Sequence, residues 1–169
     1  MPAASVLFVC MGNICRSPLA EAVLRARLAT MPALAGGEVD SAGTHGYHVG
    51  APPDERMCRA AARRGYDLTS LRARQVQLAD FDRFGWILAM DRQNLAVLQA
   101  LRAQRGIGSV PDLLLRHAPA AGTQEVPDPY YGGERGFEQV IDLVEQAVAG
   151  LLVALSQGQG PATESGAGP

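Results

Sequence analysis

Lysine is absent from this sequence, and all fifteen basic residues are arginine. A nucleotide-binding loop of the GxxxxGK[ST] type needs a lysine on the phosphates, so the sequence excludes that class of nucleotide-binding protein. The arginines are balanced by seventeen acidic residues, and the formal net charge is −2. A chain with this charge has no overall attraction to nucleic acid or to an anionic membrane. Any affinity for an anionic substrate must therefore be local.

Cysteine is also scarce, with three residues at positions 10, 15 and 58. An odd number of cysteines in a reducing compartment indicates free thiols rather than a structural disulfide framework. The three histidines form no metal-ligand spacing with these cysteines, so we expect neither a metal nor a cofactor. Each cysteine has to be considered separately.

Long hydrophobic runs are missing at the start of the chain. Residues 1–5 carry no basic side chain, and the apolar run 6–10 is too short for a signal-peptide core or a membrane-spanning helix. We therefore expect a cytoplasmic protein that binds no membrane and no nucleic acid, unless it is exported without a signal peptide.

The length of 169 residues and the hydrophobic content of 47% fit one globular domain, which we assign to residues 1–155. Residues 156–169 consist mainly of Gly, Pro, Ser, Thr, Ala and Gln. Such a segment buries too little apolar surface to offset the entropy lost on ordering, so it predicts a flexible tail.

Short apolar runs alternate with segments of helical periodicity along the chain. Strands are predicted at residues 5–9, 38–41, 86–90 and, from a weaker pattern, 110–115. Helices are predicted at about residues 19–29, 54–64, 92–102 and 136–155. This alternation favours a three-layer α/β fold, in which helices cover both faces of a parallel sheet. Ligands of such sheets bind at the carboxyl ends of the strands.

Two polar residues stand where helices are expected to begin. Ser17 precedes Pro18, a pair typical of a helix N-cap followed by proline in the first turn. Asp91 is interpreted as the cap of the helix at 92–102 rather than as a second acid. The predicted helix at 54–64 carries four arginines that we interpret as a solvated face: Arg56, Arg59, Arg63 and Arg64.

The segment from Cys10 to Ser17 connects the first predicted strand to the first predicted helix. Backbone N–H groups in such a loop point into one concavity, and the helix dipole adds to them, so the loop is expected to bind an anion. Arg16 would close the loop with a planar guanidinium that matches two phosphate oxygens. The same field favours a thiolate at Cys10, placed for in-line attack on a phosphate ester. Ser17 could donate to that thiolate.

An isolated cysteine and arginine at this spacing would more often be a buried thiol and a surface charge. The position of Cys10 and Arg16 between a strand and a helix start is what favours catalysis.

The loop Val9-Cys-Met-Gly-Asn-Ile-Cys-Arg-Ser-Pro18 matches in full the V-C-x-G-N-x-C-R-S-P loop of the low-molecular-weight protein tyrosine phosphatases, which this sequence resembles. The resemblance continues through residues 41–44, 72–75, 89–91 and 126–131. It implies a four-stranded sheet of order 2-1-3-4 and hydrolysis of phosphotyrosine through a phosphocysteine at Cys10, without metal. It also implies substrate contacts from six loop residues: Met11, Gly12, Asn13, Ile14, Cys15 and Ser17.

Asp128, between Pro127 and Pro129, is the candidate general acid. An aspartate between prolines is usually a turn former, but the resemblance places the acid that protonates the leaving phenolate here. Tyr130 and Tyr131 would form an aromatic wall beside the substrate ring or, alternatively, anchor the loop. The resemblance places Tyr47 in the opposite wall.

Three further positions qualify the resemblance. Ile14 stands where a related protein arginine phosphatase carries threonine, so it favours phosphotyrosine. Cys15 is either a small buried residue or, as the family implies, the partner of Cys10 in a reversible protective disulfide. Leu71 replaces the usual histidine that bonds to Asn13 and Ser41. We therefore expect Asn13 to rely on Ser41 or water alone, with a less rigid loop and lower activity.

Other functions are less consistent with the sequence. An arsenate reductase of the same fold needs two further cysteines in the region 80–98, which has none. A non-catalytic phosphoprotein-binding module would not need Cys10, Arg16 and Asp128 together. The expected partner is a phosphotyrosine-containing protein, with a tyrosine kinase as one candidate, and phosphate-like oxyanions are expected to inhibit.

Overall fold

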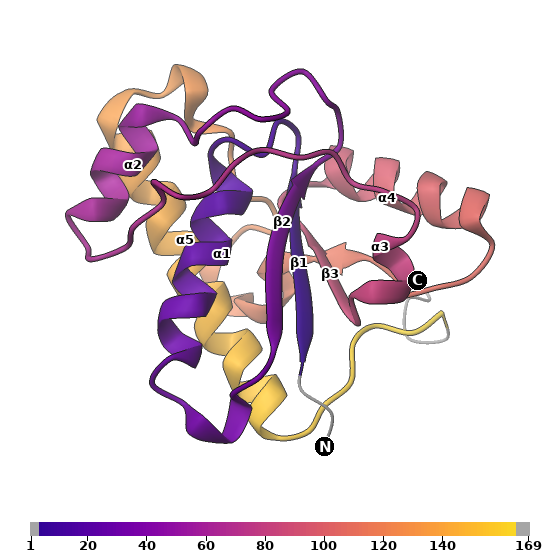
Figure 1. The fold of residues 1–169 in the computed structure, drawn as a ribbon. Coiled ribbons are helices and arrows are strands. Elements are labelled where there is room, and N and C mark those ends of the chain that lie inside the picture. Colours follow the sequence, from indigo (N-terminus) through magenta and orange to yellow (C-terminus); the bar gives the residue numbers. More distant parts are fainter. Residues whose placement is uncertain (1–3, 165–169) are drawn as a thin grey trace.

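The computed structural model describes residues 4–164. Four strands form one sheet with the order β2-β1-β3-β4, and all paired strands are parallel (Figure 1). The strands are β1 (Ser5–Cys10), β2 (Glu38–Gly43), β3 (Trp86–Ala89) and β4 (Asp112–Leu113). The parallel sheet and its order are those expected. The weak pattern at 110–115 contributes only the short β4, because the chain turns into a 3-10 helix at Leu114.

Among residues 4–164, five α-helices cover the sheet, with α1, α2 and α5 on one side and α3 and α4 on the other (Figure 1). They are α1 (Arg16–Leu28), α2 (Glu55–Ala62), α3 (Asp80–Arg83), α4 (Arg92–Arg105) and α5 (Gly133–Ser156). The short α3 has no counterpart among the predicted helices. Gly106, with φ 87°, ends α4 in the left-handed conformation that glycine adopts at low cost.

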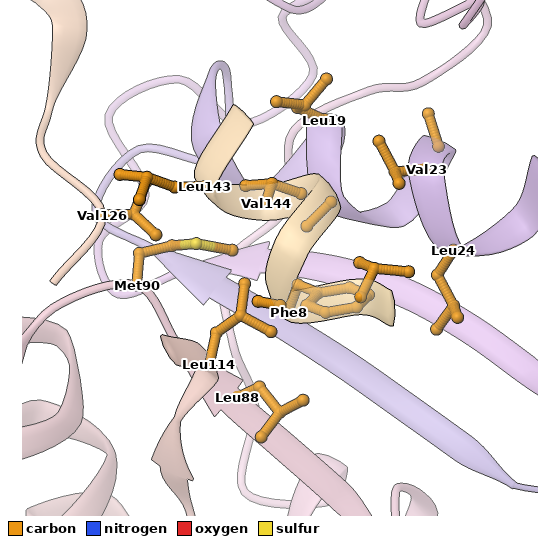
Figure 2. Close-up of a cluster of buried hydrophobic side chains, with 14 of the residues drawn as sticks. Phe8, Leu19, Val23, Leu24, Leu88, Met90, Leu114, Val126, Leu143 and Val144 are labelled. Atoms are coloured by element: carbon orange, nitrogen blue, oxygen red, sulfur yellow. The ribbon is translucent and has the colours of Figure 1, made fainter. Parts of the chain in front are cut away.

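The central strand β1 is buried on both faces, and its alternating side chains enter two separate cores. Val6, Phe8 and Cys10 join the core beneath α1 and α5, whereas Leu7 and Val9 join the core beneath α3 and α4. Figure 2 shows Phe8 beneath the side chains of α1 and α5. This packing fixes the carboxyl end of β1, from which the Cys10 loop departs.

The helix α5 is long and apolar enough, by length and composition, to cross a membrane. More than half of its most apolar window is buried within the fold, where α5 packs on α1 and α2. We therefore assign α5 to the core of a globular domain. The helix reaches Ser156, and beyond it the Glu164 carboxylate accepts a hydrogen bond from Arg102 at 2.8 Å. Residues 165–169 of the predicted tail lie outside the described residues.

Of the two predicted helix caps, Asp91 is as expected and Ser17 is not, and Asp54 is a further cap that was not predicted. Asp54 accepts from the backbone N–H of Arg56 at the start of α2, and Asp91 accepts from that of Asn94 at the start of α4. Ser17 does not cap α1, because the helix already begins at Arg16 and its cap position is Cys15, two residues before Ser17. The Ser17 side chain is directed at the Cys10 sulfur instead.

The arginine face of α2 is only partly solvated. Arg64 is 27% exposed and lies within 2.8 Å of the carboxylates of Glu138, Asp142 and Glu145 on α5. These contacts hold α2 against α5, so the prediction of a solvated residue is wrong for Arg64. Arg59, by comparison, is 63% exposed.

Candidate active site

The loop between β1 and α1 is the centre of the site. Cys10 is the last residue of β1 and Arg16 is the first of α1, so the intervening residues turn at the carboxyl end of the central strand. Asn13 has φ 57° and is the only non-glycine with positive φ within residues 4–164. Asparagine tolerates this conformation better than most residues, which explains how the loop can curl back over the strand end.

Two hydrogen-bonding groups contact the Cys10 sulfur. The backbone N–H of Asn13 donates to Sγ at 3.3 Å, and the Ser17 hydroxyl lies 3.0 Å from it. Cys10 is only 3% exposed, so these contacts are sheltered from water. Both groups can donate to a thiolate sulfur, which makes them suitable for holding a nucleophile and later a leaving group.

A buried network behind the loop fixes Asn13. Its side-chain amide donates to the Ser17 and Ser41 hydroxyls at 2.8 and 2.9 Å, and its carbonyl oxygen accepts from the backbone N–H of Arg74 at 2.9 Å. The expectation that Asn13 would rely on Ser41 or water alone is therefore wrong. Leu71, in place of the usual histidine, is partly buried and packs against the core. The expected effect of Leu71 on activity stays a prediction.

Arg16 is almost fully buried and is held by two acceptors. Its Nη1 donates to Asp91 Oδ2 at 2.8 Å and to the carbonyl oxygen of Val126 at 3.0 Å. Burial alone would lower the pKa of Arg16, but the negative charges of Cys10 and Asp91 outweigh burial and raise the pKa. Arg16 is therefore a fixed cation at the loop.

Asp91 has a second role that sequence reasoning missed. It caps α4 with Oδ1 and orients the Arg16 guanidinium with Oδ2. Its position just after β3 could have indicated this role, because β3 is the neighbour of β1 and the two strands end at the same edge of the sheet.

Asp128 reaches the same site from a loop more than a hundred residues further along the chain. Its Oδ1 accepts from the backbone N–H of Tyr130, which caps the 3-10 helix η4 (Pro129–Tyr131). Its Oδ2 lies 4.0 Å from Arg16 Nη2, and the side chain is 49% exposed. Asp128 is thus oriented by the backbone while one oxygen stays accessible at the mouth of the site.

These residues surround a pocket of about 110 Å³. Eight of the residues singled out in the sequence line it: Cys10, Met11, Gly12, Ile14, Cys15, Arg16, Asp128 and Tyr130. Asn13 and Ser17 are buried behind the loop. Tyr47 is 86% exposed and is not among the lining residues, and the side chain of Tyr131 lies outside the described part of the chain.

Four lining residues escaped sequence reasoning: His45, His48, Asp54 and Phe137. His45 and His48 belong to the glycine-rich loop that follows β2, at the same edge of the sheet as Cys10. Their place after a strand end was the available signal. Phe137 is a buried residue of α5 and carries no such signal, because it looks like ordinary core.

Cys15 lines the same pocket as Cys10. Burial, followed by the charge of Cys10, raises the pKa of the Cys15 thiol. Cys15 therefore stays protonated at neutral pH and does not compete as a nucleophile. All three cysteines are free thiols in the structure, so a disulfide between Cys10 and Cys15 stays a prediction.

Metal ligands do not gather in the part of the chain that the structure describes, where no group of three or more His, Cys, Asp or Glu side chains could hold an ion.

The buried carboxyl of Glu21 ends the network behind the loop. It accepts from the Ser41 hydroxyl at 2.7 Å and from Arg25 Nε at 3.0 Å, and it is 3% exposed. Burial raises the pKa of Glu21 despite these hydrogen bonds. Over the interval between the unfolded and folded pKa values, the folded protein binds the extra proton, so this group stabilises the fold less as pH rises.

We therefore expect Glu21→Gln to gain stability relative to wild type as pH rises from the unfolded pKa, near 4.5, through the higher folded pKa. Glutamine keeps the acceptor for Ser41 but removes the titrating charge. Thermal midpoints of both proteins, measured from about pH 4 to about pH 8, test this expectation. Parallel curves for the two proteins would show that Glu21 has an ordinary pKa.

The family model described as low molecular weight phosphotyrosine protein phosphatase matches residues 5–160. A low molecular weight protein-tyrosine-phosphatase of Streptomyces coelicolor is 44% identical over 154 residues, which cover 90% of this chain and 93% of the relative. A solved protein tyrosine phosphatase from Entamoeba histolytica has a TM-score of 0.84 and 39% identity, and the match covers 92% of this chain and 99% of that one.

A solved arginine phosphatase from Drosophila is also similar, with a TM-score of 0.80 and 31% identity over 89% of this chain and 96% of that one. It shares the fold with the tyrosine phosphatases but is less similar to this chain than the two proteins above. The match of the family model over nearly the whole chain, together with the convergence of Cys10, Arg16 and Asp128 on one pocket, identifies the protein's family. The chain belongs to the low molecular weight phosphotyrosine protein phosphatases.

Proposed function

We propose that this protein hydrolyses phosphotyrosine in proteins by two displacements at phosphorus, through a phosphocysteine on Cys10. The observation that carries the proposal is the meeting of a sheltered thiol, a fixed guanidinium and an accessible carboxyl in one small pocket. Membership of the family supports phosphotyrosine proteins as the substrates.

In the first displacement, the phosphate would lie in the loop between its backbone N–H groups and Arg16. The Cys10 sulfur attacks phosphorus, an S–P bond forms, and the bond to the phenolic oxygen breaks. Asp128 transfers its proton to the departing oxygen, so that tyrosine leaves as a neutral phenol. Asp91 contributes by keeping the guanidinium of Arg16 in position.

In the second displacement, water attacks the phosphorus of the phosphocysteine and loses a proton to the Asp128 carboxylate. The S–P bond breaks, phosphate is released and the Cys10 thiolate is restored. The Ser17 hydroxyl, 3.0 Å from the sulfur, is positioned to donate to the thiolate as it leaves.

The pocket walls support an aromatic ester as the substrate. Ile14, Met11 and Tyr130 offer apolar surface around the anion loop, which suits a phenol ring better than a short polar side chain. The same surface favours phosphotyrosine over phosphoarginine, whose guanidinium is charged. We expect tyrosine kinases among the substrates, phosphate-like oxyanions as inhibitors and a cytoplasmic location.

The covalent intermediate provides the test. Wild-type protein should hydrolyse p-nitrophenyl phosphate, and acid quenching during turnover should give a protein carrying one phosphate, which peptide mass spectrometry assigns to Cys10. Phosphate found on another residue would contradict the mechanism. Faster release of phosphate from a phosphoarginine peptide than from the matched phosphotyrosine peptide would favour the arginine phosphatase alternative.

A further inference from the structure

A second groove adjoins the catalytic pocket and is rich in arginine. It has a volume of about 180 Å³ and is lined by Arg56, Arg59 and Arg63 from α2 and its C-terminal end, and by Glu134 and Phe137 of α5. We call it the α2 groove. Phe137 also lines the catalytic pocket, so the two hollows share a wall.

Arg56 joins the α2 groove to the substrate wall. Its guanidinium carbon lies 5.2 Å from the centroid of the Tyr130 ring and 4.9 Å from that of Phe137, and its Nη1 donates to the Tyr130 carbonyl oxygen at 3.2 Å. Tyr130 lines the catalytic pocket. A peptide that places phosphotyrosine in the pocket can therefore pass over Tyr130 and Arg56 into the groove.

The groove has more positive than negative charge. Positions 56, 59 and 63 are spaced by three and four residues, which puts their side chains on one face of the helix. Three guanidinium groups line the groove against one carboxylate, that of Glu134. Asp142 and Glu145 of α5 bond to Arg64 at 2.8 and 2.7 Å, and Glu138 is shared between Arg64 at 2.6 Å and Arg63 at 3.3 Å.

Arg59 is the guanidinium most available to a ligand. It is 63% exposed, and its ion-pair partner Glu55 is 4.0 Å away and 93% exposed. An exposed pair at this distance contributes little and is easily exchanged for another carboxylate. Arg56 and Arg63 lie closer to their partners, Asp54 at 3.0 Å and Glu138 at 3.3 Å.

We propose that the α2 groove is a specificity subsite that binds acidic side chains of the substrate close to the phosphotyrosine. This inference rests on the proposed function for the identity of the reacting residue. The two hollows share Phe137, and an extended peptide advances about 3.3 Å per residue, so residues close to the phosphotyrosine in sequence are the ones that enter the groove. The groove selects among phosphotyrosine proteins by charge, whereas Cys10, Arg16 and Asp128 perform the chemistry.

The test compares two phosphotyrosine peptides of equal length, one with aspartate and glutamate beside the phosphotyrosine and one with asparagine and glutamine. We expect wild-type kcat/KM to be roughly fivefold higher for the acidic peptide at low salt, and the preference to fall as salt is added. In Arg59→Gln the preference should fall to roughly twofold or less, and in Arg59→Glu it should disappear. Hydrolysis of p-nitrophenyl phosphate should not change in either variant, because this substrate does not reach the groove.

Arg116→Gln is the matched control. Arg116 is 57% exposed and also pairs with an acid four residues away, Asp112, but it lines neither the catalytic pocket nor the α2 groove. It should keep the wild-type preference. Equal kcat/KM for the two peptides in wild type, or a preference that survives Arg59→Glu, would overturn the proposal.

A binding measurement on variants without the Cys10 thiol tests the groove independently of the proposed catalytic function. The same peptides are titrated against Cys10→Ser and Cys10→Ser/Arg59→Glu and followed by fluorescence anisotropy. We expect Cys10→Ser to bind the acidic peptide more tightly than the neutral peptide, and Cys10→Ser/Arg59→Glu to bind both equally. This result supports the groove as a binding site even if the wild type shows no turnover. A third peptide, with a second phosphotyrosine in place of the acids, distinguishes the anion. If Arg59→Glu weakened binding of this third peptide but not of the acidic peptide, the proposal that the groove binds carboxylates would be overturned.

Discussion

Replacing Cys10 with serine is expected to abolish turnover of p-nitrophenyl phosphate, with a loss of at least roughly 10⁴-fold in kcat. A serine hydroxyl is far less ionised than a thiol and is a poor nucleophile without a neighbouring base. The contacts of Cys10 are the backbone N–H of Asn13 and the hydroxyl of Ser17, and neither can act as that base. Steady-state rates of the purified variant provide the measurement.

The matched control is Cys58→Ser. Cys58 lies in α2, outside the catalytic pocket, and its thiol donates only a long hydrogen bond to the carbonyl oxygen of Pro53 at 3.7 Å. This variant should keep wild-type turnover. Cys10→Ser should also retain binding of phosphate, since Arg16 and the loop backbone remain. Appreciable turnover by folded Cys10→Ser would exclude Cys10 as the nucleophile.

The second large effect is expected for Asp128→Asn, with kcat for phenyl phosphate falling by roughly 10² to 10⁴-fold. Asparagine can still accept from the backbone N–H of Tyr130, so the loop keeps its cap while losing the transferable proton. The phenolate must then leave without protonation. Rates for a series of aryl phosphates whose phenols differ in acidity measure the effect.

The leaving groups act as an internal control for Asp128→Asn. A strongly acidic phenol such as dinitrophenol needs little protonation, so its phosphate ester should lose much less activity than phenyl phosphate. The variant should therefore depend more steeply on leaving-group acidity than wild type does. An equal loss across the series would show that Asp128 orients the substrate and transfers no proton.

Residues contiguous in sequence were those whose placement could be predicted. The pattern of β1 predicts a loop directly after it, and Cys10, Ile14 and Arg16 all belong to that short segment. In the structure all three line one pocket. The cap Asp91 could be predicted for the same reason, because a cap bonds to a backbone group two or three residues away.

Side chains with more than one possible partner could not be placed in this way. Ser17 has the residue type of a helix cap, yet its hydroxyl contacts Cys10 and Asn13, because the helix begins at Arg16 and its cap position is Cys15. Tyr47 was expected in a pocket wall but is exposed. The centroid of its ring lies 4.4 Å from the centroid of the His45 ring. Arg64 was expected in solvent but bonds to α5, whose register against α2 is a tertiary property.

The sequence by itself determined the parallel sheet and the loop from Cys10 to Arg16 that carries the proposed nucleophile, because these depend on hydrophobic pattern and on residues within a few positions of one another. Only the tertiary structure decided that Asp91 orients Arg16, that Asp128 stands at the mouth of the pocket and that Arg56 and Arg59 lie along its extension. These contacts join strand ends, loops and helices far apart in the chain. Their distances follow from how the helices pack on the parallel sheet, which spacing along the sequence does not encode.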